Sequence, residues 1–281
     1  MFKFFKHRVV RLLEKIPFVQ IYIYNNLKFF KFLFPHDKDY YALRLIFKLE
    51  EKRTFLDVGG NIGLSSIGFR VLGFKENKIF IFEPDKYLCD TYLVSLNKYY
   101  KNIFIFNYGL SYKNDKKYLY QAYYKNLFLH FNNSFDLSYI KKKIKDNYPD
   151  KYKNFLYRKK RFQVKKFDQL NIKKDICFIK IDVEGFDHLV LRGMKKLIIQ
   201  NHPVFLIEFN ASNFTTIYNL LKKKYDCFIY LFEKNELKKL NKIDIKNLFS
   251  NKTLDIKYSK NSFNIFFVPI NFNFHDKNRI I

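Results

Sequence analysis

The chain has 281 residues, 48% of them hydrophobic, and its 53 basic and 26 acidic side chains give a formal net charge of +27. This composition excludes a disordered or collagen-like chain, and the length suits one α/β domain with additions. Three cysteines without a Cys-x-x-Cys pair argue against a disulfide framework and a structural zinc site, and they favour a reducing compartment. No apolar run reaches the roughly 20 residues that a membrane-spanning helix needs.

From residue 54 onward, short β-branched or aromatic runs alternate with segments of helical length. Strands are predicted at residues 54–58, 79–82, 103–106, 177–181, 204–209, 227–232 and 265–268. Helices are predicted at residues 64–72, 84–99, 187–200 and 214–224. This order predicts an α/β domain over residues 51–281, with a seven-stranded, mostly parallel sheet and helices on both faces. A basic insertion at about residues 111–176 interrupts the domain.

Two segments carry most of the basic charge. Residues 1–34 have a net charge of +6, and residues 141–174 have a net charge of +11. Residues 1–50 are predicted to form a basic, aromatic helical appendage, which either packs on the domain or lies on an anionic membrane surface. The lysine-rich tract within the insertion is read either as a solvated loop or as a binding site.

The first predicted strand ends in a glycine-rich turn, DVGGNIG, over residues 57–63. Glycines permit a tight turn and let a ligand approach the backbone, while the following helix offers free N–H groups. A dinucleotide fingerprint would need glycines where the chain has Asn61 and Leu64. The Asp-x-Gly-x-x-x-Gly spacing therefore favours the adenosyl cofactor of methyl transfer over NAD, and a purely structural turn is the alternative.

Acidic residues follow two further predicted strands. Glu83 comes after the apolar run IFIF, where its carboxylate could accept hydrogen bonds from both hydroxyls of an adenosyl ribose or simply begin the next helix. In the segment IKIDVEGFD, strand alternation places Lys180, Asp182 and Glu184 on one side at the end of the fourth strand. Such charges need partners, so this end holds either a site or a closed ion-pair network.

The segments LDVGGNIG, IFEPD, IKIDVEGFDHLVLRGM and HPVFLIEFN resemble the FkbM family of S-adenosylmethionine-dependent methyltransferases over roughly residues 54–210. The resemblance implies the class I methyltransferase fold, which is Rossmann-like, with six parallel strands and a final antiparallel one. It also implies methyl transfer from S-adenosyl-L-methionine to a hydroxyl, often on a sugar of a glycan or a secondary metabolite. The cofactor-binding residues that it implies are Asp57, Gly59, Gly60, Asn61, Gly63, Glu83 and Asn107.

The same resemblance places Asp182 and Glu184 near the reacting methyl group. Methyl transfer is an in-line displacement, so the protein must align the acceptor and take the proton of its hydroxyl. The candidate catalytic residues are Asp182, Glu184 and His188, although His188 could equally be an ordinary helix residue. Carboxylates of Asp182, Glu184 and Glu208 would suit a divalent ion, but the spacing does not demand one and no metal site is predicted.

Two other function classes stay open. An RNA methyltransferase or nucleic-acid-binding protein would use the basic tracts, but the turn Asp-Val-Glu-Gly lacks the Asn/Asp-Pro-Pro-aromatic pattern, and its carboxylates would repel phosphates. A cofactor-binding scaffold without catalysis could dock on membranes or anionic glycans. We expect a cytoplasmic O-methyltransferase with a small-molecule or glycan acceptor and peripheral contact with an anionic membrane; no nucleic-acid partner is expected, and the sequence indicates no oligomeric state.

Overall fold

The computed structural model of the protein describes residues 35–125, 127–172, 175–249 and 264–281. Pro35–Asp115 together with Gln163–Ile281 form one compact unit, and Lys116–Phe162 belong to a second. The predicted N-terminal appendage lies outside the described residues up to residue 34. Within the described ranges, no helix has the length and apolar character needed to cross a bilayer.

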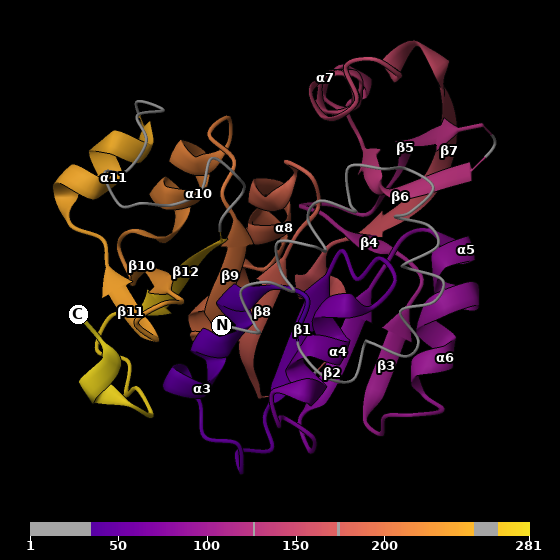
Figure 1. The fold of residues 1–281 in the computed structure, drawn as a ribbon. Helices are drawn as coiled ribbons and strands as arrows, with labels where there is room; N and C mark the ends of the chain where they lie inside the picture. Colours follow the sequence, from indigo (N-terminus) through magenta and orange to yellow (C-terminus); the bar gives the residue numbers. More distant parts are fainter. Residues whose placement is uncertain (1–34, 126, 173–174, 250–263) are drawn as a thin grey trace. The chain divides into compact units, whose positions relative to one another are not determined.

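The larger unit is built on an eight-stranded sheet with the order β11-β10-β12-β9-β8-β1-β2-β3 (Figure 1). The strands are β1 (Thr54–Val58), β2 (Lys78–Phe82), β3 (Ile103–Phe106), β8 (Ile176–Ile181), β9 (Val204–Glu208), β10 (Tyr225–Leu231), β11 (Glu236–Lys239) and β12 (Asn264–Pro269). Neighbouring strands from β3 to β9 pair in parallel, whereas β12 is antiparallel to both β9 and β10. This is the Rossmann-like class I methyltransferase fold that was predicted.

All seven predicted strands are present, and β11 is an eighth that the sequence analysis did not contain. The chain turns back through residues 232–235, where Asn235 has a φ of +54°, and β11 then pairs antiparallel with β10. Leu237 is the one fully buried residue of β11. The β11 sequence, ELKK, lacks the apolar pattern of a strand, so the prediction missed it. Its pairing with β10 makes it a strand.

Two layers of buried side chains cover the two faces of the sheet. Every residue of β1 and β8 is buried, because successive side chains enter opposite layers. Phe55 and Phe178 belong to one layer, whereas Leu56 and Ile179 belong to the other. The first layer is covered by α3 (Leu43–Ile46), α4 (Leu64–Val71), α5 (Lys86–Leu88), the π-helical segment η2 (Cys89–Leu93) and α6 (Val94–Leu96). The second is covered by α8 (Asp187–Gly193), α9 (Lys195–Asn201), α10 (Phe214–Leu221) and α11 (Lys242–Phe249).

The described part of the expected appendage belongs to this unit. The 3-10 helix η1 (Lys38–Ala42) and α3 place Tyr40, Leu43 and Ile46 in the first buried layer, each at most 2% exposed. No boundary is therefore visible at residue 50 within the described ranges. The apolar residues of this segment are buried against the sheet that follows them in the chain.

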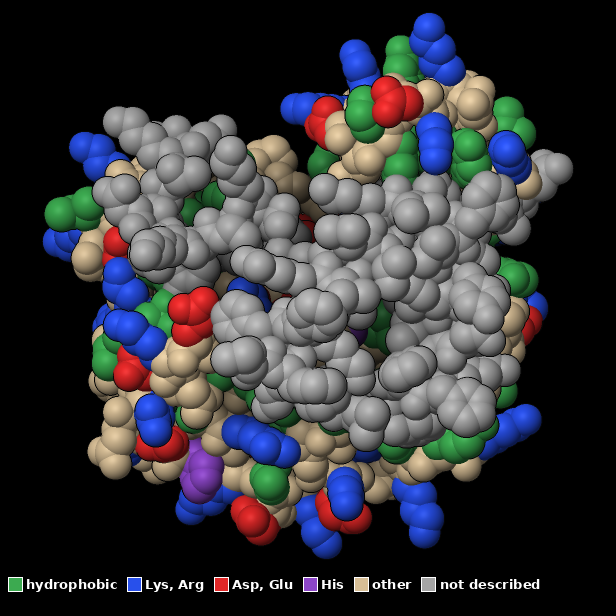
Figure 2. All heavy atoms as spheres, viewed as in Figure 1, with side chains coloured by type: hydrophobic (Ala, Val, Ile, Leu, Met, Phe, Trp, Pro, Cys, Tyr) green, Lys and Arg blue, Asp and Glu red, His purple; other side chains and the backbone are tan. Residues whose placement is uncertain are grey.

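The basic insertion has its own secondary structure and core. It contains β5 (Asp115–Tyr124), β6 (Leu127–Ser134), α7 (Leu137–Asn147) and β7 (Phe155–Lys165). With β4 (Gly109–Leu110), which precedes the insertion, the strands form a sheet with the order β4-β7-β5-β6. Ile140 and Ile144 of α7 pack with Tyr124 and Phe155 of the strands. The lysine-rich tract is therefore not a solvated loop, because much of it forms α7 and β7. Its charged side chains point outward, and Figure 2 shows Lys and Arg protruding around α7.

Candidate active site

The turn after β1 is fixed to the ends of two neighbouring strands by backbone hydrogen bonds. The N–H groups of Gly59 and Gly60 both donate to the carbonyl of Phe82, at 2.9 and 3.2 Å. The N–H group of Asp182, just past β8, donates to the carbonyl of Val58 at 3.0 Å. The ends of β1, β2 and β8 therefore meet in one cradle at the carboxyl edge of the sheet, where ligands bind in open α/β sheets.

Glycine is required in this turn by backbone conformation and by space. Gly59 and Gly63 have φ values of +85° and +84°, in the left-handed region that favours glycine. A Cβ atom at Gly59 would lie 1.9 Å from the carbonyl oxygen of Asp182, and one at Gly60 would lie 2.1 Å from Cγ2 of Ile81. The glycines thus bring the turn into close contact with β8 on one side and β2 on the other.

Glu83 follows β2 and is only 5% exposed. Its Oε2 accepts a hydrogen bond from the N–H of Asn61 at 2.8 Å, and its Oε1 accepts one from the N–H of Asp85 at 2.9 Å. Burial raises the pKa of the Glu83 carboxyl to about 7, although both hydrogen bonds favour the ionised form. The glycine turn and Glu83 are therefore joined directly through Asn61.

Asn107, the last of the predicted cofactor-binding residues, lies next to Glu83. Its Nδ2 donates to the carbonyls of Glu83 and Pro84 at 3.1 and 3.2 Å. These bonds tie the chain after β3 to the chain after β2. The side chain of Asn107 is exposed at this edge, so the structure gives it a bracing role and leaves its contact with a ligand as a prediction.

A row of charged side chains lies under the cradle. Asp57 is fully buried, and its Oδ2 accepts a hydrogen bond from Oγ of Ser66 at 2.7 Å. Its Oδ1 has no hydrogen-bond partner among the described residues and lies 3.9 Å from Nζ of Lys180. The same Nζ lies 3.0 Å from Oδ2 of Asp182, whose side chain is 38% exposed. The structure shows an ion-pair network in the interior that reaches the surface at Asp182, and a role of this segment in a site stays a prediction.

The turn from Asp182 to Asp187 is held by a residue that the sequence analysis missed. Nδ2 of Asn213, the residue before α10, donates to Oδ2 of Asp187 and to the carbonyl of Gly185, both at 3.0 Å. Oδ1 of Asp187 in turn accepts the N–H of Val183 at 3.3 Å. Burial raises the pKa of Asp187 to about 6. An asparagine ahead of a helix suggests only a helix cap, so no local signal marked Asn213 as a clamp.

The two other predicted catalytic residues lie on this turn and at the start of α8. Glu184 has a φ of +52°, an uncommon conformation outside glycine, and is followed by Gly185 at +94°. His188 is partly buried, and burial lowers the pKa of its imidazole, which favours the neutral ring at pH 7. Its Nδ1 is buried without a hydrogen-bond partner in the described part of the chain.

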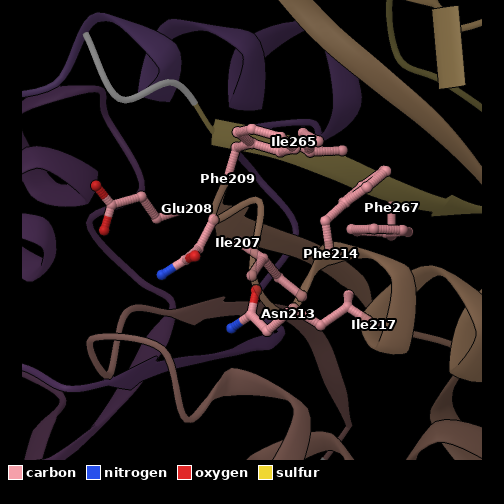
Figure 3. Close-up of a pocket in the computed structure, with 9 residues that line it drawn as sticks. Ile207, Glu208, Phe209, Asn213, Phe214, Ile217, Ile265 and Phe267 are labelled. Atoms are coloured by element: carbon pink, nitrogen blue, oxygen red, sulfur yellow. The ribbon is translucent and has the colours of Figure 1, made fainter. Parts of the chain in front are cut away.

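A small, shallow apolar hollow adjoins the end of β9. Figure 3 shows Phe209, Phe214, Ile217 and Phe267 gathered around it, with the carboxylate of Glu208 pointing away from them. Glu208 is one of the lining residues, but its carboxylate is turned away from these apolar side chains. Across residues 35–125, 127–172, 175–249 and 264–281, no group of three or more His, Cys, Asp or Glu side chains could hold a metal ion.

Residues 57–227 match the sequence model of the methyltransferase FkbM domain. The chain belongs to the FkbM methyltransferase family. It is similar to the FkbM methyltransferase structure from Methylobacillus flagellatus KT, with 15% identity over 82% of this chain and 50% of that chain and a TM-score of 0.44. This chain thus spans about half the length of that protein.

Two further solved structures are similar to this FkbM chain at 10% identity and cover 82% of it. One is a precorrin-6y C5,15-methyltransferase from Geobacter metallireducens GS-15, with 85% of that chain covered and a TM-score of 0.38. The other is a SAM-dependent methyltransferase from Aquifex aeolicus, with 93% covered and a TM-score of 0.37. No curated protein matches the chain in sequence. At these TM-scores the family assignment rests on the matched FkbM domain.

Membership of the FkbM family implies S-adenosylmethionine as the cofactor, and the cradle fits it. Gly59 lets the turn after β1 pack directly against the chain after β8, since a Cβ there would lie 1.9 Å from the carbonyl oxygen of Asp182. One ligand at this edge could therefore contact both segments. Each oxygen of Glu83 accepts one backbone hydrogen bond and keeps acceptor capacity for a ribose hydroxyl. The glycine turn would hold the methionine part, and Glu83 the ribose.

Proposed function

We propose that this protein is an S-adenosylmethionine-dependent O-methyltransferase that methylates a hydroxyl of a sugar, in a glycan or a glycosylated metabolite. The observation that supports this most is the position of Asp182. Its main chain is bonded to the end of β1 beside the glycine turn, while its carboxylate is partly exposed. An acidic side chain next to a cofactor cradle suits an acceptor that must lose a proton.

The chain's own residues would position that acceptor. Bound S-adenosylmethionine supplies an electrophilic methyl group. The Asp182 carboxylate, held at 3.0 Å by the ammonium of Lys180, would accept a hydrogen bond from the acceptor hydroxyl and take up its proton as the oxygen loses electron density. Glu184 lies two residues further on the same turn, and the neutral imidazole of His188 provides a second acceptor for the proton.

Calorimetric titration tests the cofactor part of the proposal. We expect S-adenosylhomocysteine to bind to the purified protein and NAD to give no heat of binding, because the glycine spacing lacks the dinucleotide fingerprint. Binding of NAD without binding of S-adenosylhomocysteine would contradict the proposal. Methyl transfer to neutral and acidic sugars is then measured with labelled S-adenosylmethionine.

Two substitutions test the acceptor part. Asp182→Asn and Glu184→Gln keep the side-chain shape and remove the charge, so we expect turnover to fall by about 10²- to 10⁴-fold for the residue that takes the proton. The affinity for S-adenosylhomocysteine should stay unchanged. Asp175→Asn is the matched control, because Asp175 precedes the other end of β8 and pairs with Arg53 at the surface. Wild-type turnover in both site variants would remove the assignment.

We also propose that the protein is cytoplasmic and touches anionic membranes through its basic residues. Residues 116–162 carry 13 basic and three acidic side chains, which supports attraction to an anionic surface. Flotation with vesicles that contain anionic lipid should therefore occur at low salt and be lost at high salt. The same charge would attract RNA, so RNA binding without vesicle binding would instead favour the nucleic-acid alternative.

A further inference from the structure

Lys180 is a buried cation that contacts two carboxylates from different strands. It lies on β8, and its side chain is 6% exposed. Its Nζ is 3.0 Å from Asp182 at the surface end of β8 and 3.9 Å from Asp57 at the end of β1. The strand register places Asp57 directly beside Lys180. The ammonium group therefore lies between the cofactor turn and the carboxylate that faces the acceptor.

The charges around Lys180 keep it protonated. Burial works against the ammonium form, but the negative charges of Asp182 and Asp57 outweigh burial, so the pKa of Lys180 lies above its ordinary value. Burial likewise raises the pKa of Asp57, an effect that Lys180 and the hydroxyl of Ser66 oppose. Without the ammonium, two carboxylates would face each other across adjacent strands, and at least one would protonate near neutral pH.

The other groups around this pair are fixed or lie at its edge. Tyr40 approaches from η1, and its hydroxyl donates to Oγ of Ser65 on α4 at 2.8 Å. The ring of His36 lies next to that of Tyr40, with centroids 5.2 Å apart. The pKa of His36 is lowered by burial, and the charges of Lys180, Asp182 and Asp57 also affect it. Asp187 on α8 senses the charge of Asp182 from the far side of the turn. None of these three groups replaces Lys180, whose ammonium lies within 3.9 Å of both Asp57 and Asp182.

We propose that Lys180 is a positioning residue for methyl transfer, which holds the Asp182 carboxylate ionised and fixed beside the turn after β1. It makes no contact with the acceptor in this role. It acts through Asp182 and couples the geometry of the acceptor side to that of the cofactor side. The inference rests on the proposed function, in which Asp182 faces the acceptor hydroxyl.

The substitution Lys180→Met keeps the aliphatic stem and removes the charge. We expect kcat to fall by roughly 100-fold, as for a displaced reacting group, while KM for the acceptor changes much less. The acidic limb of the pH–rate profile should move to higher pH by about 1 to 3 units, because Asp182 loses its cation. Lys180→Arg should restore part of kcat and return the acidic limb toward its original position.

Two further variants separate positioning from a general structural role. In Lys180→Met/Asp182→Asn, kcat should equal that of Asp182→Asn alone, because Lys180 acts only through Asp182. Asp57→Asn replaces the competing carboxylate with a neutral amide of similar shape next to Ser66. Asp182 then has one negative charge fewer beside it, so the acidic limb of the pH–rate profile should move to lower pH. The inference would be overturned if the acidic limb of the pH–rate profile stayed in place in both Lys180→Met and Asp57→Asn. It would also be overturned if the losses in kcat of the two single variants added fully in the double variant. If Lys180→Met does not fold, Lys180→Arg and Asp57→Asn still decide it.

A direct titration keeps this test independent of the acceptor. The pKa of Asp182 can be followed by carboxyl carbon NMR in the wild-type protein, in Lys180→Arg and in Lys180→Met. We expect it to rise by about 1 to 3 units in Lys180→Met only. If this shift is observed but no sugar is methylated, the proposed acceptor is wrong and the role of Lys180 stands. An unshifted pKa would overturn the role of Lys180 whatever the acceptor is.

Discussion

The turn after β1 and the turn after β8 adjoin each other but are built differently. The first is defined by its main chain, because a Cβ at Gly59 or Gly60 would overlap atoms about 2 Å away. The second is open, since a Cβ at Gly185 would meet nothing closer than Nδ2 of Asn210 at 3.6 Å. Side chains hold the second turn, through the clamp from Asn213 and the ion pair of Lys180.

This difference separates two kinds of mutational effect. Substitution in the first turn changes the shape of the backbone itself, so it should affect folding and cofactor affinity together. Substitution in the second turn changes charge and orientation, so it should affect turnover while the fold persists. Under the proposed function, the acceptor side can then vary without loss of the cofactor cradle.

The largest expected effect is that of Gly59→Ala. The new methyl group would lie 1.9 Å from the carbonyl oxygen of Asp182, which is a backbone atom, so one of the two backbone segments would have to shift. The left-handed φ adds about 1–2 kcal/mol, so we expect a total loss of about 4 kcal/mol or more in the free energy of unfolding. Urea unfolding followed by circular dichroism measures it. Wild-type stability would show that the two turns are not packed as described.

Glu83→Gln should have an intermediate effect, mainly on cofactor affinity. If Glu83 holds the ribose as proposed, its charge-assisted hydrogen bonds to the hydroxyls become neutral, which costs about 1.5–3 kcal/mol, or roughly 10- to 150-fold in Kd. Because the ribose favours the ionised carboxyl and the pKa of Glu83 is about 7, wild-type affinity should rise with pH through 7. Calorimetry with S-adenosylhomocysteine between about pH 6 and about pH 8 should show this rise in the wild type and a flat profile in Glu83→Gln.

The same raised pKa has the opposite effect on folding stability. Between the ordinary value of 4.5 and about 7, the unfolded chain ionises Glu83 before the folded chain does. The contribution of Glu83 to the free energy of unfolding therefore falls as pH rises through this window. Urea unfolding of the ligand-free protein at several pH values should show a weaker fall in Glu83→Gln. Identical slopes in the two proteins would contradict the raised pKa.

The smallest expected effect is that of Gly185→Ala, which is also the matched control for Gly59→Ala. Both glycines have positive φ, but only Gly59 is crowded. We therefore expect Gly185→Ala to cost only the conformational strain of about 1–2 kcal/mol, with unchanged affinity for S-adenosylhomocysteine. A loss as large as that of Gly59→Ala would erase the distinction between the two turns.

The strands and the glycine turn could be predicted because their signals are local. Buried strands such as β1 and β8 are apolar on both alternations, and the turn has a fixed glycine spacing. The partners of the second turn could not be predicted in the same way. Asn213 meets Asp187 across 26 residues, and the charged strand β11 is set by its neighbour β10. Such features arise from tertiary contact and leave no pattern in a short window.

The segment that leaves the larger unit after Asp115 and rejoins it at Gln163 starts and finishes at neighbouring points. Near those points, the N–H of Ser111 donates to the carbonyl of Lys165 at 2.9 Å, and the N–H of Lys166 donates to Oδ1 of Asn114 at 2.8 Å. These hydrogen bonds hold the two ends of the inserted segment together. The segment between them can therefore vary in length, because the entropic cost of closing a loop grows slowly with the number of residues in it. The enclosed 47 residues can thus change in length at little entropic cost while the main sheet keeps its hydrogen bonds.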